Sequence, residues 1–291
     1  MIELGRTRDE IARERFVLDV KLAINVGFGP QLRQCYEGLV LPRFKVSHDR
    51  APKTRKEIRR EMLKEPVFQI WGALWTIAQE SMWDVIGDEI FRQIPSLNRG
   101  AQVDKPRGSL KVSRNVPVPR YVAAIHIHGQ PGGYGLDFSD DDVTAGVFCE
   151  GAHRLYGRGQ GAKNRGFQVM DYLAKDLREV YPALKPLRIL DIGCNIGRTT
   201  MAIKEAFPSA EVYGIDVGPG IIRYAHAKAE SVGQELHFAL QNGEKTDFAD
   251  EFFDLIVSGT LLHETSFKAI YNIFAECHRL LSLGGVMAHL E

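Results

Sequence analysis

The chain has 291 residues, which is enough for one large domain or two ordinary ones. Hydrophobic residues make up 44% of the chain and charged residues 25%, as in soluble globular proteins. The formal net charge is zero, whereas nucleic-acid-binding proteins usually carry a basic surplus, so we expect no nucleic-acid partner. We also expect no membrane contact, because no apolar stretch reaches the roughly 20 residues of a spanning helix.

Two further features favour a cytoplasmic location. The charged N-terminus, MIELGRTRDEI, lacks the apolar segment of a secretory signal peptide. The four cysteines are scattered and form no CxxC pair, which indicates reduced thiols that bind no zinc and form no redox pair.

Residues 1–105 are expected to form a mainly helical N-terminal region. Thr7 and Glu10 have the spacing of a capping box, and the apolar residues after them recur at helical intervals. Further helices are expected over residues 54–64 and 66–94, the second of which carries all three tryptophans. Because an aromatic-rich helix usually belongs to a core or a subunit interface, this region is expected to cover the substrate or to form a homodimer.

Residues 106–166 are expected to be a linker that contains a strand, a hairpin and a lid. Residues 121–128 have strand composition and are followed by a glycine-rich turn at 129–134. On a strand, His126 and His128 would share one face, so a metal site with nearby acidic residues is one interpretation. A polar strand face is the favoured alternative, and we predict no metal.

A glycine-rich segment at residues 157–166 precedes the helix that enters the first strand of the next region. Its position favours a lid that closes over the cofactor, and the alternative is an ordinary loop. We expect the substrate or lid residues to be Tyr134, Tyr156 and Asn164.

From residue 167 onward, strands and helices alternate along the chain. This alternation predicts parallel strands joined by right-handed crossovers, and therefore a doubly wound α/β sheet. The expected strands span residues 187–192, 211–215, 236–240, 253–258 and 286–290, and the expected helices span residues 167–180, 198–206, 219–231 and 266–280.

The first of these strands ends in a glycine loop with a leading acid, Asp191-x-Gly193-x-Asn195-x-Gly197. The carboxyl end of the first strand is where doubly wound sheets bind nucleotide-like ligands, and glycines let the backbone approach such a ligand. A dinucleotide site would need the pattern G-x-G-x-x-G. The leading acid disfavours a pyrophosphate, and it suits a ligand with an ammonium group such as S-adenosylmethionine.

Polar residues also follow the next strands. Asp216, with Val217 after it, ends the second strand, where an acid accepts hydrogen bonds from ribose hydroxyls. Asn242 and Gly243 follow the third strand, where we expect the side-chain oxygen to accept from the adenine amino group and the glycine N–H to donate to the ring. Ser258 ends the fourth strand and is a further candidate for cofactor binding.

These loops resemble, in order and spacing, those of the class I S-adenosylmethionine-dependent methyltransferases of the small-molecule type. The likeness covers about residues 187–291 and rests on the segments ILDIGCNIGRTT, VYGIDVG, ALQNGE, FFDLIVSGTLLHE and RLLSLGGV. Asn195 stands where the family often has glycine, and Asn242 stands where it often has aspartate. The resemblance implies a Rossmann-like methyltransferase sheet, with the methionine end at Asp191, Gly193 and Gly197, the ribose at Asp216, and the adenine at Asn242 and Gly243.

His263 and Glu264 follow the fourth strand and are the candidate catalytic residues. The functional interpretation is a general base that takes a proton from a small-molecule acceptor, whose methylated atom is O, N, S or C. The alternative is a pair that only shapes the pocket. Two other functions remain open, which are a catalytically silent cofactor-binding interaction protein and a nicotinamide-dependent oxidoreductase.

The family fold normally has seven strands, and this sequence stops at its fifth. We expect truncation of a longer parent protein. The alternative is that strands from residues 108–128 or from a partner cover the free edge of the sheet, because an exposed edge invites pairing.

Overall fold

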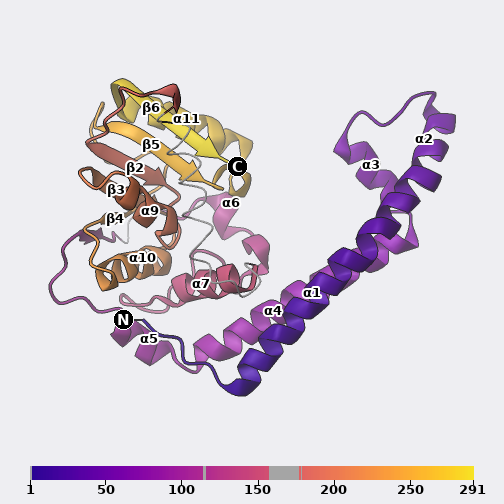
Figure 1. Cartoon of the computed structure of the whole chain (residues 1–291), viewed down its shortest axis with the longest axis horizontal. Coiled ribbons are helices and arrows are strands. Elements are labelled where there is room, and N and C mark those ends of the chain that lie inside the picture. Colours follow the sequence, from indigo (N-terminus) through magenta and orange to yellow (C-terminus); the bar gives the residue numbers. More distant parts are fainter. Residues whose placement is uncertain (1, 114–115, 157–176, 178) are drawn as a thin grey trace. The chain divides into compact units, whose positions relative to one another are not determined.

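The computed structural model describes residues 2–113, 116–156, 177 and 179–291 (Figure 1). The chain divides into two compact units, of which one is Arg6–Val85 and the other is Met1–Gly5 with Ile86–Glu291. In the described part of the chain, no helix combines the length and the apolar character needed to cross a membrane. The glycine-rich segment 157–166 and most of the expected helix 167–180 lie outside the described residues.

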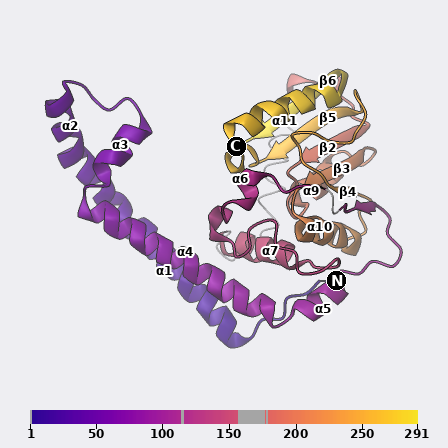
Figure 2. The same cartoon turned by 180° about the vertical axis from the view of Figure 1, so that it is seen from behind.

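The first unit is helical, as predicted. It contains the helices α1 (Arg8–Cys35), η1 (Tyr36–Val40), α2 (Leu41–His48), α3 (Arg55–Met62) and most of α4 (Pro66–Phe91). In both views α1 and α4 run side by side (Figure 2). Trp83 of α4 is buried, whereas Trp71 and Trp75 are partly exposed.

The predicted capping box at the start of α1 is confirmed. The Glu10 N–H donates to the Thr7 hydroxyl at 3.2 Å, and the Thr7 N–H donates to the Glu10 carboxylate at 2.6 Å. The first turn of a helix has backbone N–H groups without partners inside the helix, so these two bonds stabilise its beginning.

Thr7→Ala is expected to lower the free energy of unfolding of the helical unit by about 1 kcal/mol, because a donor at the helix start loses its acceptor. Urea unfolding followed by tryptophan fluorescence measures this change, since all three tryptophans lie on α4. The matched control is Thr76→Ala at an exposed position inside α4, where alanine is the better helix former. An equal loss in both variants would contradict the capping role.

The second unit contains one six-stranded parallel sheet in the order β1-β4-β3-β2-β5-β6. Its strands are β1 (Ser109–Lys111), β2 (Arg188–Ile192), β3 (Glu211–Asp216), β4 (His237–Leu240), β5 (Phe253–Gly259) and β6 (Leu281–Leu290). Its helices are α5 (Ile94–Gly100), α6 (Arg120–Ala123), η2 (Ile127–Gly129), α7 (Thr144–Tyr156), α9 (Arg198–Ala206), α10 (Pro219–Ser231), η3 (Leu262–Glu264) and α11 (Phe267–Leu280).

Helices cover both faces of this sheet, so the doubly wound arrangement is confirmed. Successive side chains of a strand point to opposite faces, and β2 shows this directly. Ile189 packs in a core cluster with residues of α9 and α10, whereas its neighbour Leu190 packs in a second cluster with residues of α11. Both side chains are fully buried, which makes β2 the central strand of the unit.

The prediction of a strand over residues 121–128 is wrong. The structure has the short helix α6 there, followed by the single turn η2, and His128 has a left-handed backbone with φ of 57°. Pro119 precedes α6, and the fixed φ of proline suits a helix N-terminus. Strand composition is weak evidence unless a neighbouring strand is present to pair with, so His126 and His128 do not share a strand face.

The alternative in which strands from residues 108–128 cover the free edge of the sheet is also wrong. The strand within this range, β1, pairs with β4, and so it lies at the edge opposite to β6. Among the residues that the structure describes, β6 pairs with β5 alone.

Candidate functional site

The predicted cofactor residues meet at one edge of the sheet, because the carboxyl ends of parallel strands lie together. Asp191 is in β2, Asp216 ends β3 and Ser258 is near the end of β5. Asn242 and Gly243 follow β4 after one intervening residue, Gln241. The sheet order therefore places these four segments side by side.

Asp191 is a fully buried residue, and one of its two carboxylate oxygens is hydrogen-bonded. Its Oδ2 accepts a hydrogen bond of 2.7 Å from the buried Thr200 hydroxyl. Its Oδ1 is buried and has no hydrogen-bond partner among the described residues. Burial, reinforced by the nearby Asp216, raises the pKa of Asp191 to about 7. A buried carboxylate with a free oxygen suits a cationic ligand, so the residue fits the ammonium group of S-adenosylmethionine.

The loop after β2 depends on left-handed backbone conformations at Gly193, Asn195 and Gly197, with φ of 69°, 48° and 74°. A Cβ at Gly193 would lie 2.5 Å from a methyl carbon of Leu261, so glycine is required there by both conformation and space. Asparagine is one of the few other residues that adopt this conformation readily. The Asn195 side chain also accepts from the Ile196 N–H at 2.7 Å, which explains how it replaces a glycine.

Asp216 links this loop to the next one. Its carboxylate accepts hydrogen bonds of 3.0 Å from the backbone N–H groups of Asn195 and Gly218. Burial raises the pKa of Asp216, while the backbone hydrogen bonds lower it in part. These backbone donors hold the carboxylate in place. Val217, which follows Asp216, is partly buried.

The segment after β4 is a tight turn against the end of β2. The Asn242 side chain accepts from the Glu244 N–H at 2.9 Å. A Cβ at Gly243 would lie 2.7 Å from a methyl carbon of Ile192, so only glycine lets the backbone come this close. The turn is thus held rigidly at the predicted adenine position, and the adenine contacts themselves stay predictions.

Ser258 is buried, and its hydroxyl lies 2.8 Å from Nδ1 of His289 on the neighbouring strand β6. This bond joins the two strands near the carboxyl edge. Burial lowers the pKa of His289, which favours the neutral ring. Cofactor binding by Ser258 stays a prediction.

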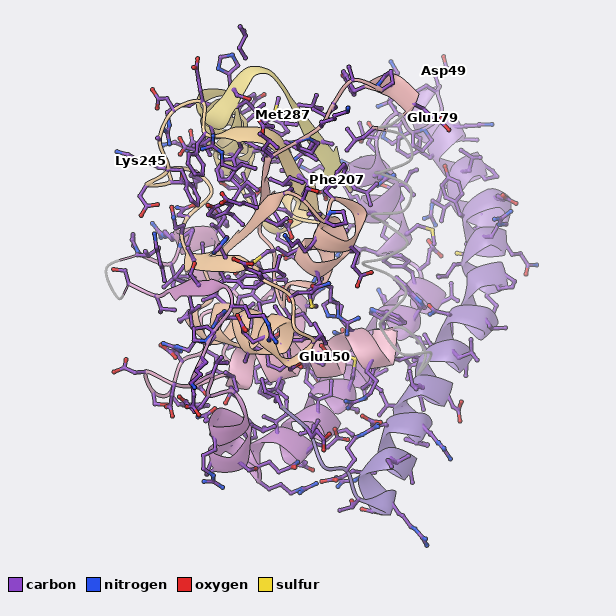
Figure 3. All side chains as sticks on the ribbon, turned by 60° about the vertical axis from the view of Figure 1, so that its left-hand side comes forward. Asp49, Glu150, Glu179, Phe207, Lys245 and Met287 are labelled. Carbon is purple, nitrogen blue, oxygen red and sulfur yellow. The ribbon has the colours of Figure 1, made fainter. Side chains whose placement is uncertain are left out.

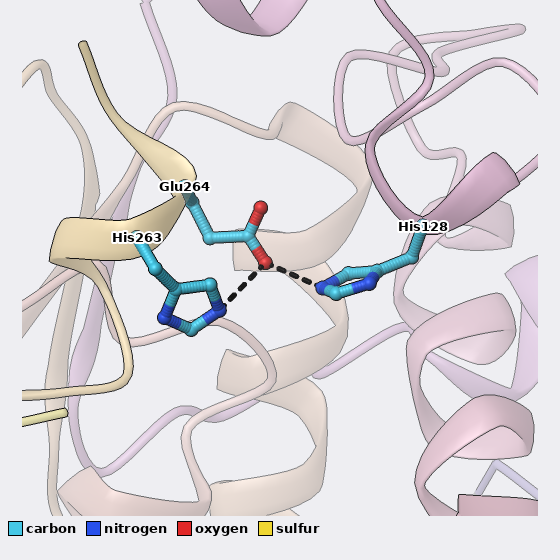
Figure 4. A group of neighbouring side chains, drawn as sticks. All are labelled: His128, His263 and Glu264. Carbon is cyan, nitrogen blue, oxygen red and sulfur yellow. Dashed lines mark hydrogen bonds and ion pairs between the residues drawn. The ribbon is translucent and has the colours of Figure 1, made fainter. Parts of the chain in front are cut away.

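The two candidate catalytic residues, His263 and Glu264, lie in η3, and His128 of η2 lies close to them (Figure 4). Glu264 Oε1 lies 2.7 Å from Nε2 of His128 and 3.4 Å from Nε2 of His263. The Tyr134 hydroxyl donates to the same oxygen at 3.2 Å. The hydrogen bond with Glu264 raises the pKa of His128. Oε1 of Glu264 is thus hydrogen-bonded to His128 and Tyr134 and lies close to His263.

Glu291 orients His263 from the other side. Its carboxylate lies 2.9 Å from Nδ1 of His263 and accepts from the Leu262 N–H at 2.6 Å. Because Nδ1 is engaged, Nε2 of His263 faces Glu264. Sequence reasoning missed both Glu291 and the role of His128, since neither lies near η3 in the sequence.

The structure describes the predicted substrate or lid residues to different extents. Tyr134 is half-buried, and it contacts Glu264 as described. A Cβ at Gly218 would lie 2.5 Å from the Tyr134 carbonyl oxygen, so this segment packs directly against the loop after β3. Tyr156 is the last residue of α7. The side chain of Tyr156 and the whole of Asn164 lie outside the described residues.

An ion-pair cluster fastens α7 beside the glycine loop. Glu150 of α7, labelled in Figure 3, bonds Arg198 at 2.6 Å and also contacts Lys228 of α10. Arg198 directly follows Gly197, so the cluster connects α7 to the first residue of α9. The two cations lower the pKa of Glu150 against the opposing effect of burial.

Comparisons with known proteins find similarity to methyltransferases. A family described as "Methyltransferase domain" matches residues 189–285. A demethylmenaquinone methyltransferase of Thermus thermophilus is 32% identical over 106 residues, which are 36% of this chain and 47% of that protein. A malonyl-[acyl-carrier protein] O-methyltransferase of Hahella chejuensis is 32% identical over 100 residues, which are 34% of each chain.

A solved structure, the PH0226 protein of Pyrococcus horikoshii OT3, shares 22% identity with this chain and gives a TM-score of 0.38. The match covers 42% of this chain and 52% of that one. The chain spans half or less of the length of the two curated relatives named above. The residues that the family matches, 189–285, include most of the central strand β2, the glycine loop and η3, and they do not include the helical unit or the segment that carries His128 and Tyr134.

Proposed function

We propose that residues 189–285, which match a family described as "Methyltransferase domain", form the cofactor-binding part of an enzyme that transfers a methyl group from S-adenosylmethionine to a small organic acceptor. The observation that carries this proposal is the buried Asp191, whose free Oδ1 stands at the cofactor edge of the sheet. An uncompensated buried carboxylate is costly for the free protein. A cationic cofactor at this position accounts for that cost.

S-adenosylmethionine supplies, when bound, a methyl group that is activated by a sulfonium. In the proposal, Asp191 balances the positive charge of the methionine end, and Asp216 accepts hydrogen bonds from the ribose hydroxyls. The further cofactor residues are Gly193, Asn195, Gly197, Val217, Asn242, Gly243 and Ser258.

On the acceptor side, Glu264 takes the proton that the acceptor loses. The Tyr134 hydroxyl and the two imidazoles at 2.7 and 3.4 Å support this assignment, because they fix the position of the carboxylate. His263, which Glu291 orients, assists Glu264. Tyr134, Tyr156 and Asn164 are proposed to contact or cover the acceptor.

Calorimetric titration with S-adenosylmethionine tests the cofactor assignment. We expect one molecule to bind per chain, and Asp216→Asn to weaken binding about 100-fold through the loss of charge-assisted hydrogen bonds. The matched control is Asp254→Asn, because Asp254 also accepts two backbone N–H groups, from Leu187 and Arg188, but does so at the start of β5. No measurable binding by the unmodified chain would refute the proposal.

Two rival functions make different predictions, and each has its own test. A catalytically silent interaction protein would bind the cofactor and form a homodimer through the helical unit, while a screen of acceptors gave no product. Dimerisation and a cytoplasmic location are also compatible with a methyltransferase. Sedimentation tests whether the chain forms a dimer. A nicotinamide-dependent oxidoreductase would be protected against heat by NAD, and the leading acid Asp191 argues against it.

A further inference from the structure

Three side chains at the carboxyl edge of the sheet have the composition of a transition-metal site. They are His128 from η2, and His263 and Glu264 from η3. One ligand atom of each residue lies within 4.8 Å of the other two. Two imidazoles and one carboxylate form a ligand set of catalytic zinc sites, which keep a further position open. We infer that these three residues bind one divalent transition-metal ion, and that Zn²⁺ suits the set.

The observed distances between the ligand atoms match those of a zinc site after a small movement of His128. Zinc binds imidazole nitrogen and carboxylate oxygen at roughly 2.0–2.2 Å, so neighbouring ligand atoms of a tetrahedral site lie roughly 3.3 Å apart. Nε2 of His263 is already 3.4 Å from Oε1 of Glu264. Nε2 of His128 is 2.7 Å from the same oxygen, which is a hydrogen-bond distance. His128 therefore needs to withdraw by roughly 0.6 Å when an ion replaces the shared proton.

The surroundings of His263 leave one of its ring nitrogens for the ion. Nδ1 of His263 is bonded to the Glu291 carboxylate, which leaves Nε2 for the ion, and metal-binding histidines usually have such a partner. Glu291 is thus a positioning residue. His128 keeps a left-handed backbone with φ of 57°, and such costly conformations gather at functional sites. Figure 4 shows the two rings on either side of the Glu264 carboxylate.

The exposure and the charge of these side chains also suit a metal ion that keeps one coordination position open. The Glu264 side chain is 13% exposed, whereas His128 and His263 are 48% and 50% exposed. The carboxylate is therefore anchored inside, and the imidazoles reach the solvent, so that water or another small ligand completes the coordination. Glu264 and Glu291 supply two negative charges for a divalent cation, and the Tyr134 hydroxyl holds Glu264 by a hydrogen bond.

Ion binding goes beyond the proposed methyl transfer and does not depend on it. The two assignments share Glu264, which would serve as a proton acceptor in one and as a ligand in the other. Metal titration and cofactor titration are therefore carried out on the same preparations. Retained ion binding without cofactor binding would refute only the methyltransferase proposal, and the reverse result would refute only the metal site.

The experiment uses the full chain, stripped with a chelator and titrated with Co²⁺, whose visible absorption reports four- or five-coordinate binding. Zn²⁺ is then added as the competitor. We expect one equivalent to bind, and His128→Ala and His263→Ala each to weaken binding more than about 100-fold. Glu291→Gln is expected to weaken binding about 10- to 100-fold, because loss of such an outer partner usually costs that much.

The matched control is His126→Ala, because His126 is an exposed histidine on the same segment, two residues from His128. It should bind Co²⁺ as tightly as the unmodified chain. Circular dichroism verifies that each variant is folded. The inference is overturned if the unmodified chain binds no Co²⁺, or if His126→Ala reduces the affinity as much as His128→Ala.

Discussion

Asp191→Asn is expected to weaken S-adenosylmethionine binding strongly and, at the same time, to make the free protein more stable at neutral pH. Asparagine keeps the shape of the side chain and can still accept from Thr200, but it removes the buried charge. The cofactor then loses the carboxylate that balances its ammonium group. A loss of about 100-fold or more in affinity follows from removing a charge-assisted contact in a buried site. Calorimetry measures this loss.

The stability gain follows from the pKa of Asp191, which burial raises to about 7 from the ordinary value of 3.8. Between these two values the folded protein binds the proton more tightly than the unfolded chain does. The contribution of Asp191 to stability therefore falls as pH rises from about 4 to 7, by on the order of 4 kcal/mol. Asp191→Asn should remove this dependence, so that its advantage in urea unfolding is largest above pH 7 and vanishes near pH 4.

Cofactor binding should also be coupled to proton release in the unmodified chain. A cation beside Asp191 favours the ionised carboxylate, so affinity is expected to rise with pH up to about 7. Calorimetry in two buffers of different ionisation enthalpy counts the released protons. Asp104→Asn, a change at an exposed aspartate, serves as the control and should leave both affinity and pH dependence unchanged. Unaltered cofactor affinity in Asp191→Asn would contradict the assigned role.

Gly146→Ala is expected to destabilise the α/β unit by about 3 kcal/mol and to lower its Tm by roughly 10 °C. A Cβ at this position of α7 would lie 2.2 Å from Cβ of Tyr224 and 3.1 Å from the carbonyl oxygen of Gly220, both in α10. The two helices would have to separate, because the nearest atoms belong to the base of a buried side chain and to the backbone. Thermal unfolding followed by circular dichroism measures the shift.

The control for this substitution is Gly72→Ala in α4, where a new Cβ would meet nothing within 4 Å. There the exchange should stabilise the helix by roughly 0.5–1 kcal/mol, since alanine has the higher helix propensity. Opposite signs at the two positions separate the steric effect from the propensity effect. A stabilised Gly146→Ala variant would show that α7 and α10 tolerate a wider spacing.

The parallel sheet and the edge at which Asp191 and Asp216 meet were predictable because each depends on local sequence. Strand–helix alternation predicts parallel strands, and Asp191 and Asp216 lie directly at strand ends, so topology alone brings them together. His128 was not predictable in the same way. Its partner Glu264 is 136 residues away, and its position depends on a turn with positive φ that replaced the expected strand. The same holds for Glu291, whose role comes from the pairing of β6 with β5.

The position of β1 has a consequence for the time course of folding on the ribosome. Ser109 of β1 meets His237 of β4, and 128 residues separate them. At a synthesis rate of about 5–20 residues per second, β1 waits roughly 6–25 s for its partner. The outer strand β1 therefore joins the sheet only after the central strands have been synthesised. We expect nascent chains to gain protease resistance late in synthesis.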